Sequence, residues 1–313
     1  MKKLLVLVSS AFAAMVGSAN ADVTVSGSAG LGAVSGNGSA TNIYSGGAVS
    51  FALSSDLGNG VVVSTSAGIT LDTNDATTAS TIGTAASGLS NIAFATGGST
   101  ITVGRAIDLA GAGTGDVSGA AGDLVDEGGY TGTARAAVSD DEGYGASLST
   151  AVGGATVTVS HILDLTPAGT EYNNASTTEA DTASGLAVSV PVGDMTLALG
   201  FASLDNTSET NTGGSVAYVM GANTIELGYQ HVQTASGTDN ETDMSARLTT
   251  SLGGAAVKVG YGSGKVGSSK TTATEINVSQ SIGTGASLFL DIQNLSGAGT
   301  SGTNMAVGTT FSF

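Results

Sequence analysis

The sequence lacks cysteine and tryptophan altogether, and it contains only 2 prolines in 313 residues. Without cysteine there is no disulfide framework and no thiolate chemistry, whether for redox reactions or for metal binding. Basic residues are scarce as well, because 8 Lys and Arg stand against 25 Asp and Glu, which gives a net charge of -17. A chain this acidic is not expected to bind nucleic acid, and it should attract cations.

Long apolar runs are absent except near the start of the chain. The stretch MKKLLVLVSSAFAAMVGSANA has two lysines, an apolar run from Leu4 to about Val16, and an A-x-A motif at its end. This order predicts a secretory signal peptide at residues 1–21, cleaved after Ala21, whose apolar part is too short to span a membrane. The mature chain, residues 22–313, then keeps six basic residues against 25 acids, a net charge of -19, and is expected outside the cytoplasm.

The rest of the chain contains many segments of about ten residues in which apolar residues alternate with small or polar ones. This is the period of a strand with one apolar face. In NTIELGYQHV, for example, Ile225, Leu227 and Tyr229 share one face, and Glu226 lies on the other. Such regular alternation predicts amphipathic strands rather than a disordered glycine-rich chain.

Turn signals rich in glycine join these segments. Seven are short, near residues 56–60, 96–98, 152–154, 191–194, 220–223, 252–254 and 282–286, and eight connections are longer and polar, near residues 34–46, 72–87, 105–142, 165–183, 205–213, 234–242, 264–272 and 296–302. Seven hairpins and one strand at each end give sixteen strands. We therefore expect an all-β protein, a transmembrane antiparallel β-barrel with both termini on the short-turn side. A soluble β-sandwich also alternates, but it rarely sorts its connections so strictly.

A closed barrel pairs every backbone group internally, as hydrocarbon requires, and turns its apolar faces towards lipid. Sixteen strands are too wide for side chains to fill, so the centre should be an aqueous channel, lined mainly by Ser, Thr, Gly and Ala. Tyr144, Tyr229 and Tyr261 are expected at the lipid boundary near the long loops, and Tyr218 near the short turns. The first five strands are expected to contain no tyrosine, and their small outer residues suit packing against another subunit.

Several stretches resemble the general porins of Gram-negative bacteria, especially the alphaproteobacterial type. They are the signal peptide, DVTVSGSAGLG at 22–32, ITVGRAIDLAGAG at 101–113, TARAAVSDDEGYGASLST at 133–150 and the final FSF. The resemblance implies a homotrimer in the outer membrane, in contact with its lipid and lipopolysaccharide, that lets small hydrophilic solutes and ions diffuse. It also implies that Phe311 and Phe313 form a signal for the barrel assembly machinery, and that a long third loop, residues 105–142, folds into the lumen.

In such porins, carboxylates of the third loop face basic residues on the wall. The resemblance therefore makes the following residues candidates for the pore constriction: Arg105, Asp108, Asp116, Asp123, Asp126, Glu127 and Arg135. Strand parity separately assigns Glu226, Arg247 and Lys258 to the lumen wall. The mature chain has only three arginines, whereas the family places a cluster of them opposite the loop. We therefore expect the acid excess to make the pore prefer cations.

Other chemistry has weaker support in the sequence. Asp72 and Asp75 offer carboxylates for Ca²⁺, although they lack an EF-hand pattern, and no cofactor is otherwise expected. His161 and His231 are possible bases of an outer-membrane hydrolase, but the sequence contains no G-x-S-x-G motif, so we expect no enzyme. A substrate-specific channel is the other alternative. It would need a ladder of aromatic or basic residues on the lumen faces, and the alternation shows neither.

Overall fold

The computed structural model describes residues 20–36, 41–73, 91–115, 117, 142–164, 182–205, 209–233, 240–297 and 301–312. The described residues form sixteen strands: β1 (Asn20–Ser35), β2 (Asn42–Asp56), β3 (Val62–Thr73), β4 (Asn91–Thr96), β5 (Ser99–Asp108), β6 (Glu142–Val152), β7 (Ala155–Asp164), β8 (Ala183–Val192), β9 (Met195–Leu204), β10 (Glu209–Met220), β11 (Asn223–Gln233), β12 (Glu241–Leu252), β13 (Ala255–Val266), β14 (Ser269–Gly283), β15 (Ala286–Gly297) and β16 (Gly302–Ser312). No helix in these ranges is long and apolar enough to cross a membrane. Residues 1–19 lie outside them, so the signal peptide stays a prediction.

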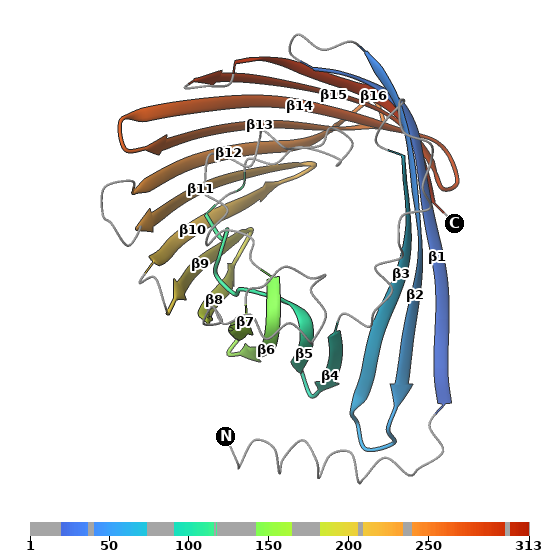
Figure 1. Ribbon diagram of the computed structural model, residues 1–313, viewed down its shortest axis with the longest axis vertical. Coiled ribbons are helices and arrows are strands. Elements are labelled where there is room, and N and C mark those ends of the chain that lie inside the picture. Colours follow the sequence, from blue (N-terminus) through green and yellow to red (C-terminus); the bar gives the residue numbers. More distant parts are fainter. Residues whose placement is uncertain are drawn as a thin grey trace, which may run out of the picture.

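The strands form one closed antiparallel barrel, in which each strand pairs with its neighbours in sequence (Figure 1). The last strand returns to the first, and the β1–β16 seam runs from Ser28 opposite Ser312 to Ser35 opposite Met305. Between these limits the seam pairs the two terminal strands with each other, which is what a sheet in hydrocarbon needs. The prediction of a sixteen-stranded antiparallel barrel is therefore confirmed.

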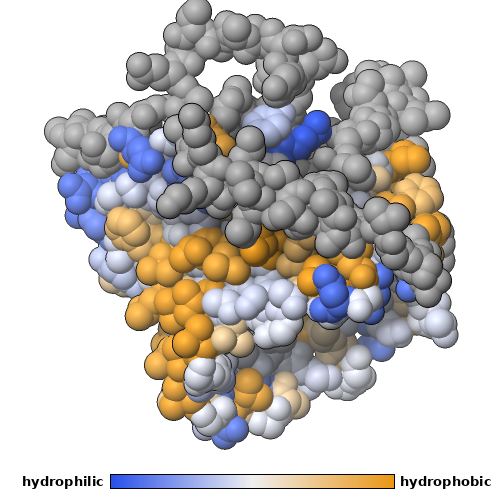
Figure 2. Space-filling view, turned by 90° about the horizontal axis from the view of Figure 1, so that it is seen from below, coloured by the Kyte–Doolittle hydropathy of each residue, from blue (hydrophilic) through white to orange (hydrophobic). Residues whose placement is uncertain are grey.

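Side chains alternate between an apolar outer face and a more polar inner face. On β11, Ile225, Leu227 and Tyr229 are 39%, 51% and 47% exposed, whereas Gln230 is fully buried. Tyr218 and Tyr261 are also exposed on the outer face, as the alternation predicted. Figure 2 shows hydrophobic residues gathered in a belt on the outer surface, with hydrophilic residues at its margins. This belt is the surface that lipid would cover.

Several predicted boundaries are corrected by the structure. The predicted long connection at residues 264–272 is a two-residue turn, Gly267 and Ser268, because β13 and β14 stay paired up to Val266 and Ser269. The strand β5 runs on to Asp108, so the connection before β6 begins at Leu109. The strand β2 begins at Asn42 and includes Tyr44, so the prediction that the first five strands lack tyrosine is wrong.

Candidate functional site

The connection after β5 begins inside the barrel. Its described part, residues 109–115 and Val117, runs along the inner wall, and in Figure 1 this blue-green segment crosses the barrel interior. The amide N–H of Ala110 donates a hydrogen bond to Ser160 Oγ on β7 at 2.7 Å. Ser245 Oγ on β12 donates to Gly115 O at 3.0 Å and accepts from the N–H of Val117 at 2.9 Å. Two wall hydroxyls thus fix this segment, here called the wall-bound segment, at its two ends.

A row of inner-face glycines lets the wall-bound segment lie directly against the strands. The row, here called the glycine track, consists of Gly185 on β8, Gly200 on β9, Gly213 on β10 and Gly228 on β11. A Cβ atom on Gly185 would overlap the carbonyl oxygen of Ala110, and one on Gly228 would overlap that of Gly115. Glycine within a strand often marks such a close approach by another stretch of backbone. The track therefore determines how far the segment stands from the wall.

Apolar contacts hold the beginning of the wall-bound segment. Leu109 packs in a buried cluster with inner-face residues of four strands, and Ala112 packs against it. The cluster members on the wall are Ile162, Ala183, Ala202, Leu204 and Val232. Burying a leucine side chain contributes about 1.5–3 kcal/mol. This part of the inner face is therefore apolar, which differs from the predicted lining of Ser, Thr, Gly and Ala.

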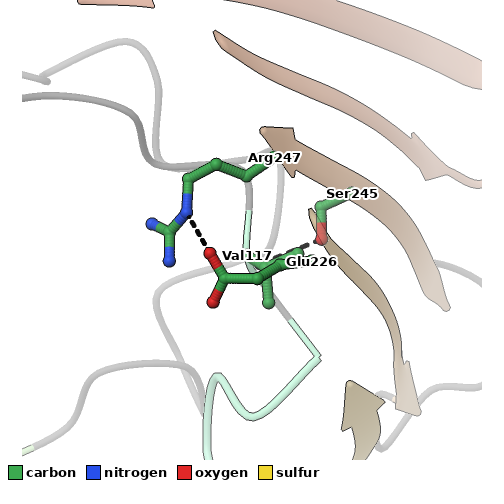
Figure 3. Close-up of polar contacts among 4 residues, drawn as sticks. All are labelled: Val117, Glu226, Ser245 and Arg247. Atoms are coloured by element: carbon green, nitrogen blue, oxygen red, sulfur yellow. Dashed lines mark hydrogen bonds and ion pairs between the residues drawn. The ribbon is translucent and has the colours of Figure 1, made fainter. Parts of the chain in front are cut away.

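Carboxylates dominate the inner face of β10–β15. Alternation and register place six acids there: Glu209, Glu226, Glu241, Asp243, Glu275 and Asp291. Two basic residues of the same described strands, Arg247 and Lys258, share this face. Arg247 Nε lies 2.6 Å from Glu226 Oε2, and the two side chains point towards each other beside Ser245 and Val117 (Figure 3). Their ion pair leaves the acids in clear excess.

The residues predicted for the site fall into three groups. Glu226, Arg247 and Lys258 occupy the inner face, as the alternation along their strands predicted. Arg105 lies at a register shift in β5, and Asp108 is an exposed residue at the end of that strand. The other constriction candidates lie outside the described residues: Asp116, Asp123, Asp126, Glu127 and Arg135. The roles of all these residues in the pore stay predictions.

The remaining predictions concern calcium and assembly. The backbone of Asp72 on β3 pairs with Gly46 on β2, but the side chain of Asp72 and all of Asp75 lie outside the described residues, so the calcium site stays a prediction. Phe311 is 46% exposed on the outer face, whereas Phe313 lies outside the described residues.

Two parts of this site were not predicted from the sequence. Five of the six acids were not singled out. Asp243, Glu275 and Asp291 follow the same parity as Glu226, whereas Glu209 and Glu241 fell within predicted loops. The glycine track was missed too, because its partner segment is remote in sequence. Its only sequence signal is one inner-face glycine on each of four successive strands.

A closed barrel with an apolar outside, a charged inside and a connection laid along its inner wall is a transmembrane channel of the porin class. The family model described as Gram-negative porin matches residues 6–300. The chain therefore belongs to the Gram-negative porin family, and its location is the outer membrane. No curated protein sequence matches the chain.

Solved structures share this fold at low sequence identity. The anion-selective porin from Comamonas acidovorans is 13% identical with a TM-score of 0.69, covering 94% of this chain and all of that one. A mutant of the Rh. blastica porin is 15% identical with a TM-score of 0.66, covering 93% and 100%. OmpT of Vibrio cholerae, in its trimer form, is 12% identical with a TM-score of 0.67, covering 94% and 99%.

Proposed function

We propose that this outer-membrane porin forms a water-filled channel through which small hydrophilic solutes and ions diffuse passively, with a preference for cations. One observation carries the preference, namely the six carboxylates against two basic residues on the inner face of β10–β15. Carboxylates along a pore raise the local concentration of cations and lower that of anions.

The fold itself does not set the sign of the preference. The Comamonas acidovorans porin has the same fold and is anion-selective by its description. Ion preference must therefore arise from the side chains that line each channel. Here the Glu226–Arg247 pair neutralises one acid, and Lys258 lies between Thr249 and Asn277 on neighbouring strands. The excess of acidic over basic residues on this face favours potassium over chloride.

A reversal-potential measurement tests this preference. In a planar bilayer with a salt gradient, the channel should show the sign of reversal potential expected for cations, and Lys258→Glu should strengthen it because it removes an inner-face positive charge and adds a negative one. Lys258→Arg, which keeps the charge, is the matched control and should match the wild type. Anion preference in the wild type would contradict the proposal.

We also propose that the chain assembles as a homotrimer through the outer face around β1. Val23, Val25 and Leu31 are exposed there at 58%, 55% and 53%, beside the small residues Gly27 and Ala29. Small residues let neighbouring backbones approach closely in a membrane. The Vibrio cholerae neighbour is described in a trimer form, which supports the number of subunits.

We propose that the barrel assembly machinery recognises the C-terminal aromatic residues. This proposal gives a prediction about assembly. Deleting Phe313 should sharply reduce the amount of folded trimer in the outer membrane while leaving the conductance of assembled channels unchanged, because the inner face is untouched. The measurement is the yield of heat-modifiable trimer in outer-membrane fractions. Phe313→Tyr keeps an aromatic end and should assemble normally, whereas normal yield from the deletion would refute this role.

Neither alternative function gains support from the described residues. His161 and His231, the possible bases of a hydrolase, lie on the outer face, where their Nδ1 atoms are 3.1 Å from Ser184 Oγ and 3.3 Å from Thr242 Oγ1. Three strands, β8, β9 and β10, lie between them, so they do not converge on one site. For a substrate-specific channel, small and strongly saturable currents for one solute would be the distinguishing result.

A further inference from the structure

Four buried polar side chains form a compact block on the inner face of β14 and β15, which are neighbouring strands of the barrel wall (Figure 1). Glu275 and Asn277 on β14 lie directly opposite Gln293 and Asp291 on β15. The four residues are between 1% and 6% exposed. Cβ atoms at directly opposite positions are about 4.5–5.5 Å apart, so the four side chains are within reach of one another. We call these four residues the oxygen block, because each carries a side-chain oxygen that can coordinate a cation.

The carboxyl group of Asp291 points into the oxygen block. It makes a hydrogen bond with the side chain of Glu275 and accepts one from the backbone N–H of Ile292. Its Oδ1 atom is buried and has no hydrogen-bond partner. Buried carboxylates are normally paired or coordinate a metal, because burial of an uncompensated charge is costly. This oxygen therefore points to a positively charged ligand in the block.

The surroundings of the oxygen block supply little positive charge. Asn304 and Ala306 face the block from β16, and neither is charged. Lys258 on β13 is the only basic residue that the described inner face of β13–β16 contributes. Arg247, one strand further away, is paired with Glu226. The two carboxyl groups of the block thus outnumber the basic side chains beside it.

Two carboxyl groups in hydrogen-bond contact cannot both be ionised unless a positive charge lies between them. A proton or a metal ion could supply that charge. The unpartnered Oδ1 atom of Asp291 and the two carboxamides favour a metal ion, because a proton shared by two carboxyl groups would use none of these oxygens. The block is therefore better suited to a cation that binds several oxygens at once.

The donor set of the oxygen block suits Ca²⁺. This hard cation takes six to eight oxygen ligands, which include carboxylates, Asn and Gln carbonyls, and water. Asn304 Nδ2 on β16 donates a hydrogen bond to Gln293 Oε1 at 3.0 Å, which orients this amide and leaves its oxygen a second lone pair. Among the described residues, no group of three or more His, Cys, Asp or Glu could hold a metal ion. The carboxamides are therefore an essential part of this donor set.

We propose that the oxygen block binds one Ca²⁺ ion through the oxygens of its four side chains, with water in the remaining positions. The ion compensates the two carboxyl groups and joins β14 to β15, next to the closing strand β16. This site is separate from Asp72 and Asp75, the calcium residues suggested by the sequence, because Asp72 belongs to β3.

Equilibrium dialysis against radioactive Ca²⁺ tests the proposal on the full mature protein, refolded into detergent without lipopolysaccharide. Asp291→Asn keeps the shape of the side chain but removes a carboxylate, so it should bind Ca²⁺ at least about tenfold more weakly than the wild type. Asn277→Asp adds a third carboxylate directly opposite Asp291, and it should bind at least about tenfold more tightly. A purely structural role of these side chains would not produce tighter binding.

The matched control is the double variant Asp72→Asn/Asp75→Asn, which removes carboxylates from the other calcium candidate and should keep the binding that depends on Asp291. Three results would overturn the proposal: binding by folded Asp291→Asn equal to the wild type, no tighter binding by folded Asn277→Asp, or no binding by the wild type up to about 1 mM Ca²⁺, the range of weak extracellular calcium modules. Heat-modifiable migration would confirm folding. If Asp291→Asn does not fold, the comparison of Asn277→Asp with the wild type decides the question.

Discussion

Replacing Gly228 with alanine should lower the single-channel conductance by at least about twofold, since pore width controls passage. A Cβ atom there would overlap the carbonyl oxygen of Gly115 and come within 2.7 Å of Ser245 Oγ. The backbone oxygen cannot rotate away as a side chain would, so the wall-bound segment must move towards the pore axis. Overpacking of this kind costs about 1–3 kcal/mol, which a closed barrel should survive.

The matched control is Gly68→Ala on β3. Gly68 also faces inwards, because the adjacent Ile69 is exposed outwards. A Cβ atom at Gly68 would lie 3.6 Å from Val49 O, which is ordinary contact. This variant should conduct like the wild type in the same bilayer recordings. An unchanged conductance of folded Gly228→Ala would show that the wall-bound segment does not limit the current.

The barrel could be predicted because lipid imposes one rule on every strand. Each second residue must be apolar wherever the outer face meets hydrocarbon, so the alternation in NTIELGYQHV is enough to specify the two faces of β11. Closure followed from the need to pair every backbone group within hydrocarbon. This information is local in sequence, and it can therefore be read without knowledge of tertiary contacts.

The same rule fails where the strands leave the hydrocarbon. Beyond Tyr261, the residues Gly264 to Val266 read as part of a polar loop, although they continue β13. Strands that extend into water carry polar residues on both faces, so the apolar alternation ends before the hydrogen bonding does. The same effect placed Tyr44 in a loop and hid the pairing of Lys265 on β13 with Lys270 on β14.

The candidate site was only partly predictable, for a different reason. Parity placed Glu226, Arg247 and Lys258 correctly on the inner face, because it depends only on the strand that carries them. The glycine track depends on contact with residues about 75 to 115 positions earlier in the chain. Glycine on an inner face can meet water or backbone equally well, and no local pattern distinguishes the two cases.

Replacing Gly308 with valine should prevent closure of the barrel. Gly308 on β16 lies at the seam, opposite Gly32 on β1 and Phe289 on β15. A Cβ atom there would overlap Leu31 O and lie 2.8 Å from both Gly32 Cα and Phe289 Cε1. The ring of Phe289 is 8% exposed and covers the glycine, an arrangement known to support glycines in sheets. Valine would therefore obstruct both neighbours of β16.

An open seam leaves two strand edges without partners, which hydrocarbon does not tolerate. We expect the folded fraction, measured by heat-modifiable migration after refolding into detergent, to fall at least about tenfold, equivalent to about 1.4 kcal/mol. Gly68→Val makes the same change at an uncrowded inner-face glycine and should refold like the wild type.

A second variant separates the two obstacles at this seam. Adding Phe289→Ala to Gly308→Val removes the ring but leaves the overlap with the carbonyl oxygen of Leu31, so the double variant should remain largely unfolded. Phe289→Ala alone should close, because it adds no atom that obstructs either neighbour of β16. If the double variant refolds better than Gly308→Val and as well as Phe289→Ala, then the ring and not the backbone of β1 is the obstacle. The requirement for glycine would then come from side-chain packing inside the barrel instead of from the approach of the two closing strands.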